Sequence, residues 1–295
     1  MRSTGLAGWE DSTLSAKTII ITGGTSGIGL AAAQALADQG HRLILIARDA
    51  DRGHKAVATL AASPGGSHRL ISADLSLMSE VRHVIAELEA TEPAIDVLAN
   101  NAGTWFQHRD LTTEAIERTV AINHLAYVAL TLGLKRLLLA APAARVINTG
   151  SFVYKQGRYD PDNLQAEKRF STNATYAATK LYNLMVTRAL ARHWADSGIT
   201  INCFSPGFVA TDFGRGEGGL LEPFYRFTRR FAISPEKGAA TLVYLATSAE
   251  AAGVSGAYFE KCRERAVGGA AANAEQCEAL LNWSVQMAGF DAAAV

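Results

Sequence analysis

A tyrosine and a lysine stand four residues apart in the segment TYAATKLYN, at Tyr176 and Lys180. Side chains with this spacing lie on one face of a helix, so the phenol and the ammonium would point into the same cleft. The ordinary pKa of a phenol is about 10, and a cation beside it favours the phenolate. Tyr176 could therefore protonate a carbonyl oxygen, or deprotonate an alcohol, near neutral pH. The alternative is an amphipathic aromatic residue packed on the helix with its hydroxyl in water.

Such a helix needs a scaffold, and the chain alternates strand-like with helix-like segments. Seven short runs rich in β-branched and aliphatic residues predict strands: KTIIIT, HRLILIA, HRLISA, IDVLAN, ARVINT, TINCFS and GAYFE. Helical spacing of apolar residues predicts helices over residues 29–40, 79–90, 114–140 and 175–198. This alternation is typical of a doubly wound α/β fold, here with a seven-stranded parallel sheet covered by helices on both faces. We expect one domain over residues 17–295, with an N-terminal extension at 1–16 and a C-terminal extension at 261–295.

A glycine-rich turn follows the first predicted strand, in the sequence TGGTSGIG at residues 22–29. Its glycines let the backbone turn tightly and approach an anion, whose charge then lies at the N-terminus of the next helix. The turn predicts a binding site for the pyrophosphate of a dinucleotide. The loop residues expected to contact it are Gly23, Thr25, Ser26, Gly27 and Ile28. The spacing is GxxxGxG, so a tight strand-to-helix turn in some other α/β protein is the alternative.

The end of the second predicted strand, LIARD, indicates which dinucleotide binds. An acidic residue about 20 residues past the glycines would bind the ribose 2′-hydroxyl of NAD. Ala47 stands at the strand end instead, and Arg48 follows it. A guanidinium here suits a 2′-phosphate and favours NADP(H) over NAD(H). The alternative is a solvated arginine with Asp49 as its neighbour.

The overall composition excludes several classes of protein. The chain of 295 residues can bury a substantial core, and 28 basic against 28 acidic residues leave no net charge to attract nucleic acid or an anionic membrane. Three cysteines without a CxxC pair indicate a reducing compartment. We find no run long enough to span a membrane and no signal-peptide pattern, and therefore expect a cytoplasmic protein. The seven histidines are scattered, which predicts no metal site.

Several further motifs share the order and spacing of one family. They are ADL at 73–75, NNAG at 100–103, INH at 122–124, INTGS at 147–151, YAATK at 176–180 and SPGFVAT at 205–211. Together with the glycine loop they resemble the short-chain dehydrogenase/reductase family, which implies a Rossmann-type fold and hydride transfer from a nicotinamide cofactor. The resemblance adds cofactor contacts at Asp74, Leu75, Asn101, Ala102, Gly103, Tyr176, Lys180, Pro206, Gly207, Val209 and Thr211.

The resemblance also implies a catalytic group of four residues. Ser151 would hydrogen-bond the carbonyl oxygen while Tyr176 protonates it. Lys180 would also bind the nicotinamide ribose, and Asn123 would hold a water that passes protons to Lys180. Local structure offers alternatives, since Ser151 could cap a turn and Asn123 could bond nearby backbone. Asp74 could likewise cap a helix that begins near residue 76.

Two longer segments, DNLQAEKRFSTNATYAATKLYNLMVTRAL and SPEKGAATLVYLATSAEAAGVSGAYFEKC, look like the retinol dehydrogenase-like branch of the family, to which WW-domain oxidoreductases are related. That branch has a long insert between its catalytic serine and tyrosine, and Ser151 and Tyr176 are 25 residues apart. INTGS departs from the usual double serine, which leaves Ser151 as the match. The branch implies apolar carbonyl substrates.

The segment 212–235 shows no clear periodicity and predicts a substrate flap rich in aromatic residues. The expected substrate contacts are Trp105, Phe106, Tyr154, Phe213 and Phe224. The sequence thus predicts an NADP(H)-dependent oxidoreductase that interconverts a hydrophobic aldehyde or ketone and its alcohol, as a monomer or a homodimer. One alternative is a reductase of a ring carbonyl or an activated C=C bond in a biosynthetic or catabolic pathway. Another is a regulatory protein that binds the cofactor without turnover.

Overall fold

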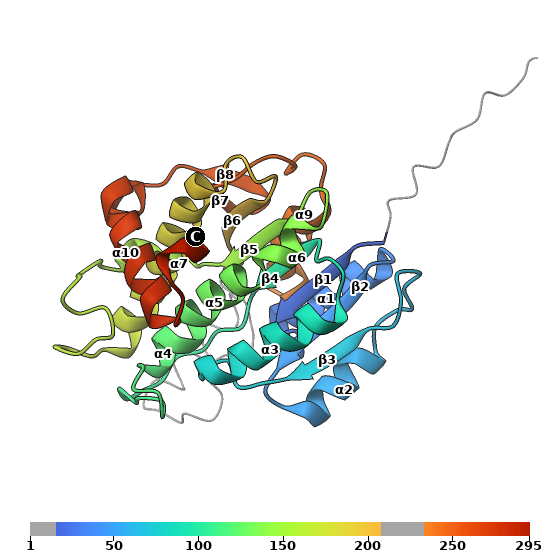
Figure 1. The fold of residues 1–295 in the computed structure, drawn as a ribbon, viewed down its shortest axis with the longest axis horizontal. Helices are drawn as coiled ribbons and strands as arrows, with labels where there is room; N and C mark the ends of the chain where they lie inside the picture. The colour runs from blue at the N-terminus through green and yellow to red at the C-terminus, as the bar shows by residue number, and fades with distance from the viewer. Residues whose placement is uncertain (1–15, 208–232) are drawn as a thin grey trace, which may run out of the picture.

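The structure, a computed structural model, describes residues 16–207 and 233–295. Within these ranges eight strands form one sheet in the order β3-β2-β1-β4-β5-β6-β7-β8 (Figure 1). The strands are β1 (Thr18–Thr22), β2 (Arg42–Ala47), β3 (Arg69–Ser72), β4 (Val97–Asn100), β5 (Arg145–Thr149), β6 (Thr200–Ser205), β7 (Tyr258–Glu260) and β8 (Arg263–Arg265). Neighbours from β3 to β7 run parallel, so the predicted doubly wound topology is confirmed.

The eighth strand corrects the predicted count of seven. It runs antiparallel to β7, with Tyr258 opposite Arg265. The turn between them places Lys261 and Cys262 at φ values of 52° and 58°, in the left-handed region that favours glycine and asparagine. β8 is three exposed charged residues long, so the sequence carries neither the strand pattern nor the turn residues that predict a hairpin.

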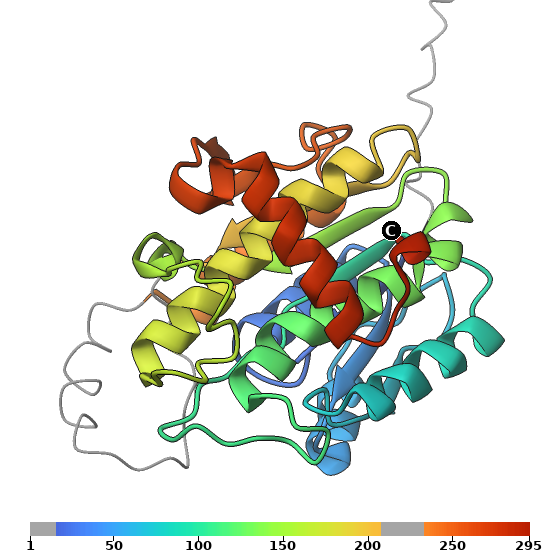
Figure 2. The same ribbon diagram turned by 60° about the vertical axis from the view of Figure 1, so that its left-hand side comes forward.

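Helices cover both faces of the sheet (Figures 1 and 2). One face is covered by α1 (Gly27–Asp38), α2 (Ala50–Ala58) and α9 (Pro235–Thr247). The other is covered by α3 (Met78–Thr91), α5 (Ala126–Gly133) and α7 (Thr172–His193), and α10 (Ala274–Met287) lies across α7 and α5. Among the described residues, no helix is both long and apolar enough to cross a membrane.

The core lies in two layers, one on each face of the sheet. Consecutive β1 residues alternate between them: Ile20 packs with α3, α5 and α7, whereas Ile19 and Ile21 pack with α1 and α9. All three isoleucines are fully buried. Burial on both faces explains why the strands read as continuous apolar runs without polar alternation.

The segment 114–140, predicted as one helix, is interrupted. It begins as α4 (Arg118–Val120), continues as a π-helical turn, η1 (Ala121–Leu125), and then as α5 and α6 (Lys135–Leu139). The helix starts at Arg118 because the buried Glu117 carboxylate accepts the Val120 N–H at 2.8 Å and caps it. A single π turn inside a helix often marks a functional site, and this one contains Asn123.

Candidate active site

The side chains of Tyr176 and Lys180 both extend from α7 toward the carboxyl end of β5. Lys180 is 2% exposed, and its Nζ donates to the Thr149 carbonyl oxygen at 3.0 Å. The same Nζ lies 5.5 Å from the centre of the Tyr176 ring. The four-residue spacing has therefore placed the phenol and the ammonium beside each other at the edge of the sheet where ligands of parallel α/β proteins bind.

Burial sets the protonation of both groups. It raises the pKa of Tyr176, and a hydrogen bond with Ser151 offsets that rise only in part. Burial also lowers the pKa of Lys180 to about 8. The sequence predicted a lowered pKa for Tyr176, because the four-residue spacing indicates the nearby cation but gives no sign of the burial of the phenol. At neutral pH the phenol is thus protonated and can donate a proton to a carbonyl oxygen.

Ser151 follows β5 and has the capping role that the sequence offered as an alternative. Its hydroxyl accepts the Val153 N–H at 3.4 Å and so caps the short helix η2 (Phe152–Gln156). It is also hydrogen-bonded to Tyr176 and is 8% exposed. The cap fixes the serine side chain where it meets the phenol.

Asn123 connects three separate segments through its amide. Its Oδ1 accepts the Thr104 N–H at 2.8 Å, and its Nδ2 donates to the Thr104 carbonyl at 2.8 Å and to Thr179 Oγ1 at 3.2 Å. These partners lie in the loop after β4 and on α7, outside the helix that carries Asn123. A Cβ built on Gly103 would lie 3.4 Å from Asn123 Oδ1 and 3.5 Å from Lys180 Nζ. Asn123 and Lys180 therefore approach the same point of the loop.

The glycine loop fits the phosphates of a dinucleotide. Gly23 and Gly27 have φ values of 66° and 51°, which other residues rarely adopt. The N-cap residue of α1, Ser26, makes no side-chain capping bond, and the first turn holds no acidic residue. The helix thus presents uncapped N–H groups that an anion can bind. Thr25 is buried in this loop, and Ile28 is partly exposed on the first turn.

The turn is held against the loop after β4. Thr22 Oγ1 accepts the backbone N–H groups of Asn101 and Ala102 at 2.8 and 2.9 Å. A Cβ built on Gly23 would lie 2.9 Å from the Ala102 Cα. The NNAG motif therefore supports the glycine turn directly.

Gly29→Ala is expected to raise the dissociation constant for NADPH at least about tenfold, because a misplaced binding group is costly even at small displacements. The new methyl group would collide with the Gly23 carbonyl oxygen and lie 2.7 Å from Asn101 Nδ2, so the turn must move. Fluorescence titration with NADPH measures the effect. Gly268→Ala is the control, because its Cβ would meet nothing within 4 Å. Equal affinities in the two variants would contradict the role of this turn.

Arg48 and Asp74 stand at the ends of β2 and β3. Arg48 is exposed, and its guanidinium makes no hydrogen bond or ion pair with the described residues, whereas Asp49 caps α2 by accepting the Arg52 N–H at 2.9 Å. Asp74 accepts the Ser76 N–H at 2.9 Å and lines a cavity of about 470 Å³. Leu75, the next residue, is buried.

The capping alternative for Asp74 needs a correction. α3 begins at Met78, and its first two N–H groups are bound by the carboxylate of Glu114, at 2.5 Å for Met78 and 2.9 Å for Ser79. Asp74 thus stabilises a turn before the helix rather than the helix itself. A cap from a residue 36 positions away leaves no local signal in the sequence.

The predicted substrate contacts differ in their placement. The Trp105 ring meets the Tyr176 ring edge-on, with centroids 6.2 Å apart. Phe106 is 7% exposed beneath the Arg118 guanidinium, and Tyr154 is 5% exposed against Tyr258, so both have little surface left for a ligand. Sequence position alone could not show which aromatic rings turn into the core.

Pro206 and Gly207 follow β6 at the carboxyl edge, where Gly207 has a φ value of 85°. The other predicted contacts in this part of the chain, Val209, Thr211, Phe213 and Phe224, lie outside the described residues, as does most of the predicted flap at 212–235.

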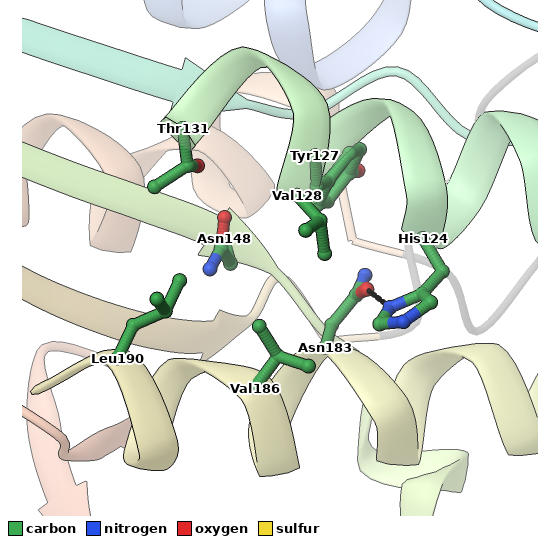
Figure 3. A pocket seen from close by; sticks show the side chains of 8 residues that line it. All are labelled: His124, Tyr127, Val128, Thr131, Asn148, Asn183, Val186 and Leu190. Atoms are coloured by element: carbon green, nitrogen blue, oxygen red, sulfur yellow. Dashed lines mark hydrogen bonds between the residues drawn. The ribbon is translucent and has the colours of Figure 1, made fainter. Parts of the chain in front are cut away.

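Two buried polar residues next to the site were not predicted. His124 follows Asn123 and is fully buried, and its Nδ1 lies 3.1 Å from Asn183 Oδ1 (Figure 3). Burial lowers the pKa of His124 to about 4, although the Asn183 hydrogen bond acts in the opposite direction. Asn183 was within reach of the sequence argument, because it lies three residues beyond Lys180 on α7 and shares its face.

His124 and Asn183 line a small internal cavity together with residues of α5, β5 and α7 (Figure 3). Its volume is about 10 Å³, which is room for one water molecule and far too little for a substrate. The cavity is therefore a gap in the packing behind the site, and its lining does not include Tyr176, Ser151 or Lys180.

Comparisons with known proteins agree with this geometry. Residues 17–218 match the family model described as short chain dehydrogenase. A Streptomyces sp. (strain C5) protein assigned as a daunorubicin C-13 ketoreductase is 37% identical, over 88% of each chain. Retinol dehydrogenase 14 of Homo sapiens is 35% identical over 87% of this chain and 82% of that protein.

Among solved structures, L-sorbose reductase from Gluconobacter frateurii, complexed with NADPH and L-sorbose, superimposes with a TM-score of 0.67 at 25% identity, covering 83% of this chain and 94% of that one. The chain therefore belongs to the short-chain dehydrogenase/reductase family, resembles its retinol dehydrogenases, and is an oxidoreductase that acts on C=O and CH–OH groups.

Proposed function

We propose that the protein is an NADP(H)-dependent reductase of hydrophobic aldehydes or ketones, which oxidises the corresponding alcohol in the reverse direction. The observation that carries the proposal is the meeting of Tyr176, Ser151 and Lys180 at the carboxyl edge of the sheet, with Tyr176 hydrogen-bonded to Ser151 and Lys180 beside its ring. The uncapped N-terminus of α1 lies at the same edge. Hydride transfer to a carbonyl needs a nicotinamide cofactor, which a phosphate site can hold, and a proton donor. Both would lie at the same edge of the sheet.

Each residue of this group has a separate task in the proposed reaction. A nicotinamide cofactor held at this edge would supply the hydride for the carbonyl carbon. The protonated Tyr176 hydroxyl gives its proton to the carbonyl oxygen, and the Ser151 hydroxyl donates a hydrogen bond to that oxygen while negative charge develops on it. The Lys180 ammonium stabilises the phenolate that remains, and a proton from solvent then restores the phenol.

The preference for apolar substrates rests on Trp105 and on the relatives. Trp105 places an aromatic ring beside the proton donor, where it can pack against an apolar ligand. The relatives are named for a ketone, in the ketoreductase, and for an apolar alcohol, in the retinol dehydrogenase. An apolar carbonyl compound is the substrate class that fits these observations.

The test is oxidation of NADPH by the purified protein, measured against a panel of apolar aldehydes and ketones with NADH in parallel. We expect turnover with at least one member of the panel and an alcohol as its product. A product reduced at a C=C bond would instead favour an ene-reductase. NADPH binding without turnover of any member would favour a regulatory protein and contradict the proposal.

Arg48→Ser is expected to raise the KM for NADPH about tenfold and to leave the KM for NADH unchanged. The guanidinium is exposed at the end of β2 and makes no ion pair within residues 16–207 and 233–295, so it can bind a 2′-phosphate, and a charge-assisted bond of this kind is worth about 1.5–3 kcal/mol. Steady-state kinetics with both cofactors measures the difference. Arg263→Ser removes an equal charge at β8, near the opposite edge of the sheet, and serves as the control. A parallel change for NADPH and NADH in Arg48→Ser would count against 2′-phosphate recognition.

A further inference from the structure

Helix α10 reaches the back of the active site from the C-terminal extension, outside the residues that match the family model. It lies across α7 and α5 (Figure 2). Ser284 on its inner face is fully buried, and its Oγ lies 2.7 Å from His124 Nε2. The neighbouring Trp283 ring lies nearly parallel to the His124 imidazole, with centroids 6.5 Å apart and planes 10° apart. α10 thus binds His124, the residue that follows Asn123, through Ser284.

The orientation of the Asn183 amide can be deduced from its partners. Its Nδ2 lies 2.8 Å from the Asn123 carbonyl oxygen and 3.3 Å from the Thr149 carbonyl oxygen. Both partners only accept, so the NH₂ group must face them and Oδ1 must face His124, as Figure 3 shows. Thr149 also accepts from Lys180 Nζ at 3.0 Å, so Asn183 and Lys180 share one carbonyl.

This orientation decides which nitrogen of His124 carries the proton. Asn183 Oδ1 is an acceptor, so His124 Nδ1 must donate to it. A neutral imidazole has only one N–H, so Nε2 is an acceptor and needs a donor. The Ser284 hydroxyl is that donor, although the Leu280 carbonyl oxygen, 2.8 Å away in the same helix, is a competing acceptor. Without Ser284 the buried Nε2 has no donor among the described residues. In the opposite tautomer His124 Nδ1 would carry a lone pair, which would face the acceptor Asn183 Oδ1.

We propose that Ser284 is a positioning residue of the reductase site: its hydroxyl donates to Nε2 of the His124 tautomer that Asn183 requires, and His124 through Asn183 holds the backbone of Asn123 and the carbonyl that binds Lys180. The proposal rests on the roles of Asn123 and Lys180 in the proposed function. It makes α10 part of the active site, although no atom of that helix needs to touch the cofactor or the substrate.

The first test compares two substitutions on α10. Ser284→Ala is expected to lower kcat about tenfold and to change the KM for the carbonyl substrate less than about threefold, because Asn123 and Lys180 shift while no proposed substrate contact is removed. Val285→Ala, the next residue and also buried, loosens α10 without removing a hydrogen bond and is expected to keep kcat within about twofold. Thermal unfolding of both variants shows whether their losses of stability are comparable. An unchanged kcat in Ser284→Ala, or an equal fall in Val285→Ala, would overturn the proposal.

The second test does not measure turnover, so its outcome does not depend on the reductase proposal. Nitrogen-15 NMR of the histidine-labelled protein reports the tautomer of each ring, and the His124 signal is the one of seven that is absent in His124→Gln. We expect a proton on Nδ1 and a hydrogen-bonded, unprotonated Nε2 in the wild type, and in Ser284→Ala a shift of the Nε2 resonance toward that of a nitrogen without a hydrogen-bond donor. A proton on Nε2 in the wild type would refute the deduction. If the reductase proposal failed but the tautomer was as deduced, the hydrogen-bonded network itself would still be supported.

Discussion

Tyr176→Phe is expected to lower kcat by about a thousandfold while the protein stays folded and still binds NADPH. The substitution removes the proton donor and keeps the ring, and general acid catalysis contributes roughly 10²–10⁴ in rate. The ring also keeps its edge contact with Trp105, so its position should be unchanged. Single-turnover measurement of NADPH oxidation separates the chemical step from binding and product release.

The matched control for this prediction is Tyr182→Phe. Tyr182 lies on the same helix, is 2% exposed, and likewise loses only a buried hydroxyl. It is two residues beyond Lys180, on another face of α7, and we expect turnover to change by less than about threefold. If both variants lost activity equally, a general effect on α7 would explain the loss, and Tyr176 would not be the specific acid.

Lys180→Met is expected to lower kcat/KM at least about a hundredfold and to raise the free energy of unfolding by about 1 kcal/mol. The activity falls because the cation beside the phenolate is lost. The stability rises because a nearly buried ammonium, which donates to the Thr149 carbonyl and to no carboxylate among the described residues, is replaced by an apolar chain of similar length. That carbonyl keeps a donor in Asn183 Nδ2, so no acceptor is left unpaired.

The pH dependence of this stability difference follows from the lowered pKa of Lys180. Burial moves it from 10.5 to about 8, so the unfolded chain binds more protons than the folded one between these values. The cost of the buried ammonium is therefore complete below pH 8 and disappears as the pH rises to 10.5. Denaturant unfolding of both proteins at pH 7 and about pH 10 tests this sign. A Lys180→Met protein that is less stable than the wild type at pH 7 would show that the ammonium stabilises the fold.

The same lowered pKa has a consequence for the cofactor. The fraction of Lys180 that is charged in the free protein falls as the pH rises through 8, so NADPH binding should weaken between pH 8 and 9 in the wild type. In Lys180→Met the binding should show no such step.

The sequence alone determined the features that depend on local pattern. Burial on both sides of a parallel sheet gave continuous apolar runs, and all seven predicted strands are present. The glycine loop could be located because positive φ values and an uncapped helix start need small residues at fixed positions. The pair Tyr176 and Lys180 could be named because four residues bring side chains onto one face of a helix.

Tertiary structure decided everything that depends on groups far apart in the chain. The pKa of Tyr176 rises because surrounding elements remove water from it, and no local spacing shows that burial. Phe106 and Tyr154 turn into the core for the same reason. The hydrogen bond from α10 to the active site joins residues 160 positions apart, His124 and Ser284, each of which reads in the sequence as an ordinary polar residue in a helix. Periodicity records which face of an element is buried, but only the packing of distant elements fixes which atoms meet there.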